Sequence, residues 1–147
     1  EQLSEWFQMD SDSPYMLFVS DVNESKQIRM DDKEEELFGL DKLNIPKSSI
    51  PAVTHVDYSS RIQTVHKNTN PIYHELITQF FKLTGCPIVV NTSFNVRGEP
   101  IVCSPKDAFK CFMGTDLDVL VIGNFILYKE LQNLQLKEDY KNKYNLD

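Results

Sequence analysis

The sequence has no long apolar run and no paired cysteines, and these absences exclude several classes of protein. None of its apolar stretches reaches the roughly 18 residues of a membrane-spanning helix. Cys86, Cys103 and Cys111 are odd in number and unpaired in spacing, which excludes a disulfide framework. We interpret them as reduced residues in or near the core of a cytoplasmic protein. The opening residues lack both an initiator Met and the features of a secretion signal, so we expect a fragment of a longer protein.

The motifs of common metal and phosphate sites are also missing. None of the spacings H-x-H, H-x-x-E-H and C-x-x-C occurs, so the sequence predicts no metal site built from this chain alone. The glycine-rich phosphate motifs G-x-x-x-x-G-K-[ST] and G-x-G-x-x-G are absent as well. A phosphate site in this chain would therefore have to use other donors.

The charge of the chain is acidic. It has 15 Lys and Arg against 22 Asp and Glu, which gives a net charge of −7. This balance argues against nucleic acid or an anionic membrane as a partner, but a few directed donors could still hold a small anion. A length of 147 residues with 41% hydrophobic and 25% charged residues is typical of a single globular domain.

Local patterns predict two helices with clear boundaries. The first covers residues 70–85, with Asn70 as N-cap, Pro71 at the first helical position and Gly85 at the end. The second covers residues 104–114, where Ser104 caps the helix and Pro105 begins it. Both helices carry apolar residues at helical spacing, so we expect them to cover a sheet.

Aromatic and β-branched runs predict the strands of that sheet. They lie at residues 13–22, at 52–65 as two short strands around a turn at 58–60, at 86–91, and at 117–128 as two strands. We interpret the acidic stretch 23–49 as a variable polar loop or short helix, and 129–147 as a marginally amphipathic tail helix. The whole pattern predicts one α/β domain of the α+β type, with a mixed twisted sheet flanked by helices.

A dense polar cluster follows the expected strand 86–91. In PIVVNTSFNVRGEPIVCSP, Asn91, Thr92, Ser93, Asn95 and Arg97 come directly after an apolar run. In α/β folds, ligands bind at such strand ends, and these side chains together with nearby backbone N–H groups could surround an anion. The alternative is a simple turn, because Asn, Ser, Thr and Gly are common turn residues. In that case Arg97 and Glu99 could form a surface ion pair of little energetic value.

Two residues further upstream are candidates with equally plain alternatives. Arg61 lies on an expected strand, where it could be a solvated edge residue or could hold phosphate through its bidentate guanidinium. His55 could be a hydrogen-bonded structural residue or could line a ligand site.

Taken together, these segments resemble a known family. SPYMLFV, AVTHVDYSSRIQTV and the continuous run from NPIYHELITQ to DLDVLVIG resemble the C-terminal part of O-carbamoyltransferases, which carbamoylate antibiotics and nodulation factors. In that family an N-terminal actin-like domain binds a metal and the acceptor. A C-terminal YrdC-like domain cleaves carbamoyl phosphate and joins the carbamate to ATP, which gives carbamoyl-adenylate. The resemblance implies that this chain is most of the YrdC-like domain.

The resemblance also implies residue roles. Arg61 and Ser93 would be catalytic, with Arg61 on phosphate, and Mg²⁺ would accompany ATP, held more by the phosphates than by the protein. The residues expected to line the nucleotide and phosphate site are Arg61, Asn91, Thr92, Ser93, Asn95, Arg97 and His55.

One departure from the family limits what this chain is expected to do alone. Basic residues that the family uses lie upstream of the segment matching SPYMLFV, so we expect little or no adenylation by residues 1–147 in isolation. Two alternatives stay open. One is an enzyme resembling threonylcarbamoyl-adenylate synthases, although their lysine/arginine motif is not visible here. The other is a non-catalytic binding domain of the same fold.

Overall fold

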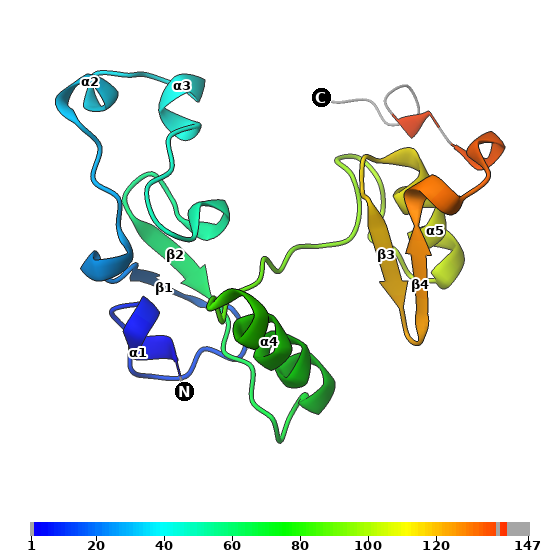
Figure 1. Cartoon of the computed structure of the whole chain (residues 1–147), viewed down its shortest axis with the longest axis horizontal. Helices are drawn as coiled ribbons and strands as arrows, with labels where there is room; N and C mark the ends of the chain where they lie inside the picture. The colour runs from blue at the N-terminus through cyan, green and yellow to red at the C-terminus, as the bar shows by residue number, and fades with distance from the viewer. Residues whose placement is uncertain (1, 138, 141–147) are drawn as a thin grey trace. The chain divides into compact units, whose positions relative to one another are not determined.

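The computed structural model describes residues 2–137, 139 and 140, which divide into two compact units, Glu1–Val90 and Asn91–Asp147 (Figure 1). Each unit combines short helices with a two-stranded antiparallel sheet, so the α+β class expected from the sequence is confirmed. The strands form two separate antiparallel pairs among the described residues, rather than one mixed sheet. In the part of the chain described, no helix is long and apolar enough to cross a membrane.

The first unit is built around one strand pair. Strand β1 (Phe18–Asp21) pairs with β2 (Ser59–Ile62), with Phe18 opposite Ile62 and Val19 opposite Arg61. The helices of this unit are α1 (Leu3–Trp6), α2 (Asp32–Glu35), α3 (Leu40–Leu43) and α4 (Pro71–Thr84), with 3₁₀ turns at Glu24–Lys26 and Pro51–Val53. The core of the unit consists of Trp6, Phe7, Val22, Ile50 and Ile62.

Helix α4 begins and ends where the sequence predicts. The Asn70 side chain accepts a hydrogen bond from the Tyr73 backbone N–H, and Pro71 occupies the first helical position. Gly85 ends the helix with a φ of 73°, a left-handed conformation that glycine adopts without a Cβ penalty. The apolar stripe of α4 is largely exposed, however, with Ile72 at 83% and Leu83 at 86% of full exposure.

Three strand predictions in this unit were wrong or too long. Residues 86–91 do not form a strand; a strand exists only where a second strand pairs with it, and none does so among the described residues. Cys86 and Ile88 nevertheless pack against the core of the first unit. Within residues 52–65 only Ser59–Ile62 is a strand, because this segment begins with the 3₁₀ turn Pro51–Val53. The strand expected over 13–22 is confined to Phe18–Asp21. The polar stretch 23–49 contains the short helices α2 and α3.

The second unit packs one helix on one hairpin. Helix α5 (Pro105–Gly114) contacts strand β3 (Val119–Ile122), which pairs with β4 (Phe125–Tyr128) as the sequence predicts. Gly123 has a φ of 55° and begins the two-residue turn of the hairpin, where a positive φ matches the twist of the strands. The core of this unit consists of Ala108, Phe112, Met113 and Leu120.

Both ends of α5 are satisfied by side chains. Ser104 accepts a hydrogen bond from the Asp107 N–H at 3.2 Å, as an N-cap does. At the other end, the Lys129 ammonium donates to the Phe112 carbonyl and, at 2.9 Å, to the Thr115 carbonyl. A cation at the C-terminus of a helix is favoured by the helix dipole. Burial lowers the pKa of Lys129.

The tail expected as one helix from residue 129 is only partly described. It forms two 3₁₀ turns, Lys129–Leu131 and Leu134–Leu136, instead of a continuous α-helix up to that point. The expected helical residues 141–147 lie outside the described part of the chain. Tyr140, near this limit, is buried.

Candidate functional site

The polar cluster lies at the start of the second unit, and its later residues belong to a closed turn. The Val102 N–H donates to the Phe94 carbonyl at 3.1 Å, and the Glu99 N–H donates to the Val96 carbonyl at 3.0 Å. Gly98 has a φ of 81°, so the chain reverses there in a conformation that favours glycine. We call residues 91–99 the polar loop.

Asn95 supports the loop from inside. Its Nδ2 donates to the Val96 carbonyl at 3.1 Å and to the Glu99 carbonyl at 2.9 Å. Its Oδ1 is buried and has no hydrogen-bond partner among the described residues. A buried acceptor without a donor costs free energy, so this oxygen is a candidate to accept from a ligand or a water.

The other predicted residues of the loop face outwards. Thr92, Ser93 and Arg97 are exposed, as is Asn91, which also makes an interaction within the protein. The loop therefore presents two hydroxyls, an amide and a guanidinium to solvent, which are donors suited to a phosphate or a nucleotide. Among the described ion pairs, the one between Arg97 and Glu99 that we considered as an alternative does not occur.

Glu99 holds the loop, a role that the sequence analysis missed. Its Oε2 accepts from the Val96 N–H at 3.0 Å, and its Oε1 accepts from the Tyr140 hydroxyl at 2.7 Å. The first contact spans three residues and is typical of a tight turn. The second spans 41 residues, so no local pattern could have revealed it.

Arg61 lies in the first unit, on strand β2. Its side chain is exposed, while the next residue, Ile62, is buried. Its partner across the sheet is the half-exposed Val19. Within the described chain, the guanidinium forms no ion pair and no hydrogen bond, so it is available to an anion.

His55 belongs to a chain of hydrogen bonds in the first unit. Its Nδ1 lies 2.8 Å from the Ser59 Oγ, which donates to the Asp57 Oδ1 at 2.7 Å. Because the single hydroxyl proton of Ser59 goes to Asp57, Ser59 accepts from His55, and Nδ1 carries a proton. The hydrogen bonds from Ser59 lower the pKa of the Asp57 carboxyl.

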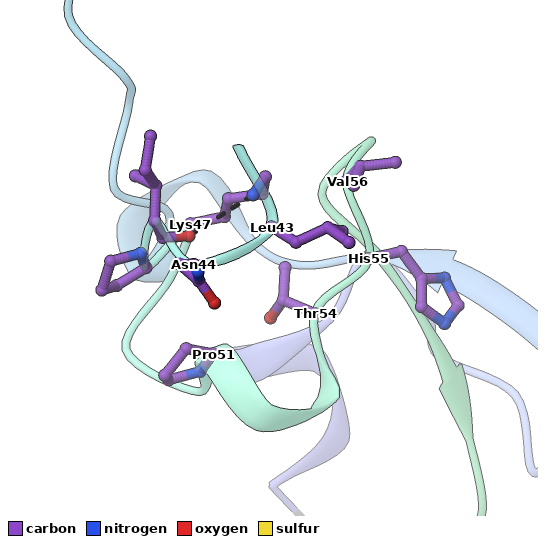
Figure 2. A pocket seen from close by; sticks show the side chains of 9 residues that line it. Leu43, Asn44, Lys47, Pro51, Thr54, His55 and Val56 are labelled. Atoms are coloured by element: carbon purple, nitrogen blue, oxygen red, sulfur yellow. Dashed lines mark hydrogen bonds between the residues drawn. The ribbon is translucent and has the colours of Figure 1, made fainter. Parts of the chain in front are cut away.

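A cavity of about 580 Å³ lies beside His55 (Figure 2). Its lining comes from the segment after α3 and from the turn before β2. Figure 2 shows the imidazole turned away from Asn44 and Thr54. Lys47 also lines the cavity and is buried. Its ammonium donates to the Lys42 carbonyl at 2.7 Å and so caps the C-terminal end of helix α3. Of the residues predicted for the site, His55 is the one that lines this cavity in the described part of the chain.

The predicted residues thus fall into two groups. Asn91, Thr92, Ser93, Asn95 and Arg97 lie together in the polar loop of the second unit, whereas Arg61 and His55 lie in the first unit. That both groups serve one ligand stays a prediction. Among the described residues there is no cluster of three or more His, Cys, Asp or Glu that could hold a metal ion.

We expect iodoacetamide at about pH 8 to alkylate Cys103 in the folded chain and to spare Cys111, because only the thiolate reacts. Cys103 is exposed, whereas burial and the neighbouring Glu99 carboxylate raise the pKa of Cys111 to about 11. Peptide mass spectrometry would quantify both sites, with the urea-unfolded chain as the control in which all thiols react. Equal alkylation of Cys103 and Cys111 in the folded chain would contradict this packing.

Comparison with known proteins places these residues in a family. The family described as Carbamoyltransferase C-terminus matches residues 1–129. Protein sll1178 of Synechocystis is 55% identical over 141 residues, which are 96% of this chain and 23% of that protein. The nodulation protein NolO of Bradyrhizobium diazoefficiens is 39% identical over 138 residues, 92% of this chain and 22% of that protein.

One of the relatives carries the name of an O-carbamoyltransferase. The 3'-hydroxymethylcephem-O-carbamoyltransferase of Amycolatopsis lactamdurans is 31% identical over 124 residues, which are 84% of this chain and 20% of that enzyme. The chain therefore spans less than a quarter of the length of these relatives. With a family match over nearly its whole length, this chain belongs to the carbamoyltransferases, whose C-terminal region it matches.

Proposed function

We propose that this chain is the part of an O-carbamoyltransferase that makes carbamoyl-adenylate from carbamoyl phosphate and ATP. The observation that carries the proposal is the polar loop. Its backbone is held by Asn95 and Glu99, while the side chains of Thr92, Ser93 and Arg97 stay exposed as donors. A hydrogen-bonded turn with exposed donors on it and directly before it suits a nucleotide phosphate.

The chemistry needs such donors and no protein nucleophile. Water cleaves carbamoyl phosphate to carbamate and phosphate. A carbamate oxygen then attacks the α-phosphorus of ATP, and the bond from that phosphorus to the bridging oxygen of pyrophosphate breaks. Positioning and stabilisation of negative charge supply most of the catalysis in such a transfer. Ser93, Arg97 and Arg61 carry the hydroxyl and guanidinium groups that can do this.

Asn95 has a specific place in this proposal. Its Oδ1 is a buried acceptor without a donor among the described residues. The carbamoyl NH₂ and the ribose hydroxyls are donors that could pair with it. Mg²⁺ would neutralise the ATP phosphates and would be held mainly by them and by water.

The rest of the enzyme lies outside this chain in the proposal. An actin-like metal domain of the same longer protein would bind the acceptor and receive the carbamoyl group, in the cytoplasm. We propose that residues 1–147 alone have little activity, because the upstream basic residues of the family are not among them. A YrdC-like fold of the complete domain is part of the same proposal.

The test is exchange of labelled pyrophosphate into ATP by the longer protein, with and without carbamoyl phosphate. We expect exchange only when carbamoyl phosphate is present, and at least about a hundredfold less from the chain 1–147 alone. No exchange by the longer protein would refute adenylate formation and favour a binding domain. Equal exchange by both proteins would refute the expected dependence on upstream residues. Exchange that requires threonine and bicarbonate instead would favour the threonylcarbamoyl-adenylate alternative.

A further inference from the structure

Tyr140 lies outside the residues that the carbamoyltransferase family matches, which end at residue 129. It is 6% exposed, and its hydroxyl donates to the Glu99 Oε1 at 2.7 Å. The residue is thus a part of this chain's own C-terminal segment that reaches the polar loop. A buried tyrosine hydroxyl needs a hydrogen-bond partner, and here a carboxylate accepts its hydrogen bond. This contact fixes the position of Glu99 as well as that of the ring.

The ring of Tyr140 packs at the C-terminal end of helix α5, against Gly114. A Cβ at Gly114 would overlap with the Tyr140 ring at its Cγ and Cδ2 atoms. The ring therefore lies directly over the Gly114 Cα, where only glycine leaves room for it. Because α5 is anchored in the core through Phe112 and Met113, this contact ties the position of Tyr140 to the core of the second unit.

Glu99 connects Tyr140 to the polar loop. One carboxylate oxygen accepts from Tyr140, and the other accepts from the Val96 N–H at 3.0 Å. Its backbone carbonyl accepts from the Asn95 side chain at 2.9 Å. No described ion pair involves Glu99, so the two neutral donors, the Val96 N–H and the Tyr140 hydroxyl, orient its carboxylate.

We propose that Tyr140 is a positioning residue that acts through Glu99 to fix the polar loop in its ligand-binding shape. The functional half of this inference rests on the proposed function. Asn95 and Arg97 lie four and two residues before Glu99, inside the turn that the Val102 N–H closes on the Phe94 carbonyl, and Ser93 directly precedes that turn. A change in Glu99 therefore acts on Asn95 and Arg97 together. A displacement of about 1 Å in a positioning group can cost up to about a hundredfold in rate.

The decisive variant is Tyr140→Phe, which keeps the ring over Gly114 and removes only the hydroxyl. Tyr128→Phe, at a residue that is 46% exposed, is the matched control. In the chain 1–147, we expect faster hydrogen exchange at the Val96 and Glu99 N–H groups in Tyr140→Phe and no change in Tyr128→Phe. Unchanged exchange in Tyr140→Phe would overturn the proposal.

The catalytic readout is pyrophosphate exchange by the longer protein. Tyr140→Phe should lower kcat about 10- to 100-fold with the same melting temperature, and it should add little to the loss already caused by Glu99→Gln. Fully additive losses, or a kcat equal to wild type, would overturn the positioning role. If wild type shows no exchange at all while the loop N–H groups still lose protection in Tyr140→Phe, the proposed function fails and the structural tie between Tyr140 and the loop stands.

Discussion

Replacing Arg61 by alanine should lower carbamoyl-phosphate-dependent pyrophosphate exchange by the longer protein at least about a hundredfold. This is the usual cost of removing one donor that stabilises charge in the transition state. The guanidinium is exposed on β2 and has no partner within the described chain, so its removal should leave the fold intact. Arg61→Lys should recover only part of the rate, because an ammonium cannot bind phosphate in a bidentate way.

Ser93→Ala should cause a loss of similar size, since its exposed hydroxyl is a donor of the polar loop. The matched control is Arg29→Ala, which removes an exposed arginine of the first unit from outside the site. Steady-state exchange rates, with circular dichroism as the check on folding, would measure all four variants. Wild-type rates in both Arg61→Ala and Ser93→Ala would contradict their catalytic assignment and return the polar cluster to a simple turn.

Phe112→Ala should destabilise the second unit by about 3–5 kcal/mol, the typical cost of emptying a large buried aromatic site. Phe112 is completely buried between α5 and the β3–β4 hairpin, and its ring also contacts the Lys129 ammonium at 4.1 Å. The change therefore removes core packing and a cation–π contact at once.

The control for this change is Phe125→Ala, because Phe125 lies on β4 and is 74% exposed. It should shift stability by no more than about 0.5 kcal/mol. Native-state hydrogen exchange of α5 and of the hairpin would report on the second unit separately from the first. Equal exchange in the two variants would show that Phe112 does not lie in the core of this unit.

The helix boundaries could be predicted because their causes are local. Asn70 and Ser104 cap N–H groups three residues ahead, and Gly85 supplies a left-handed end. Each of these signals lies within one turn of the helix that it bounds. The β3–β4 hairpin was predictable for the same reason, since its two-residue turn sits between two apolar runs.

The composition of residues 86–91 alone could not decide whether they form a strand. The run Ile88, Val89 and Val90 indicates an extended apolar segment, and Ile88 does pack on the core of the first unit. A strand also requires a partner that accepts its hydrogen bonds, and the partner is a property of the whole fold. Apolar composition therefore predicted burial of part of this segment and misjudged its pairing.

The site shows the same division between local and distant causes. The donors of the polar loop could be named from the sequence because they are adjacent in it. The residues that hold the loop could not, since Tyr140 contacts Glu99 across 41 residues and Glu99 was considered only as an ion-pair partner of Arg97. A carboxylate beside an arginine suggested a surface pair, whereas the structure directs it to a backbone N–H and a phenol.

The assignment of the polar loop to nucleotide binding is best tested by hydrogen exchange of the longer protein, measured with and without nucleotide. We predict that ATP with carbamoyl phosphate slows exchange in the polar loop, residues 91–99, and around Arg61, while the β3–β4 hairpin is unchanged. Protection of other segments with no change in residues 91–99, under conditions where pyrophosphate exchange proceeds, would contradict it. In that case the adenylate would be made at a site that does not include the polar loop.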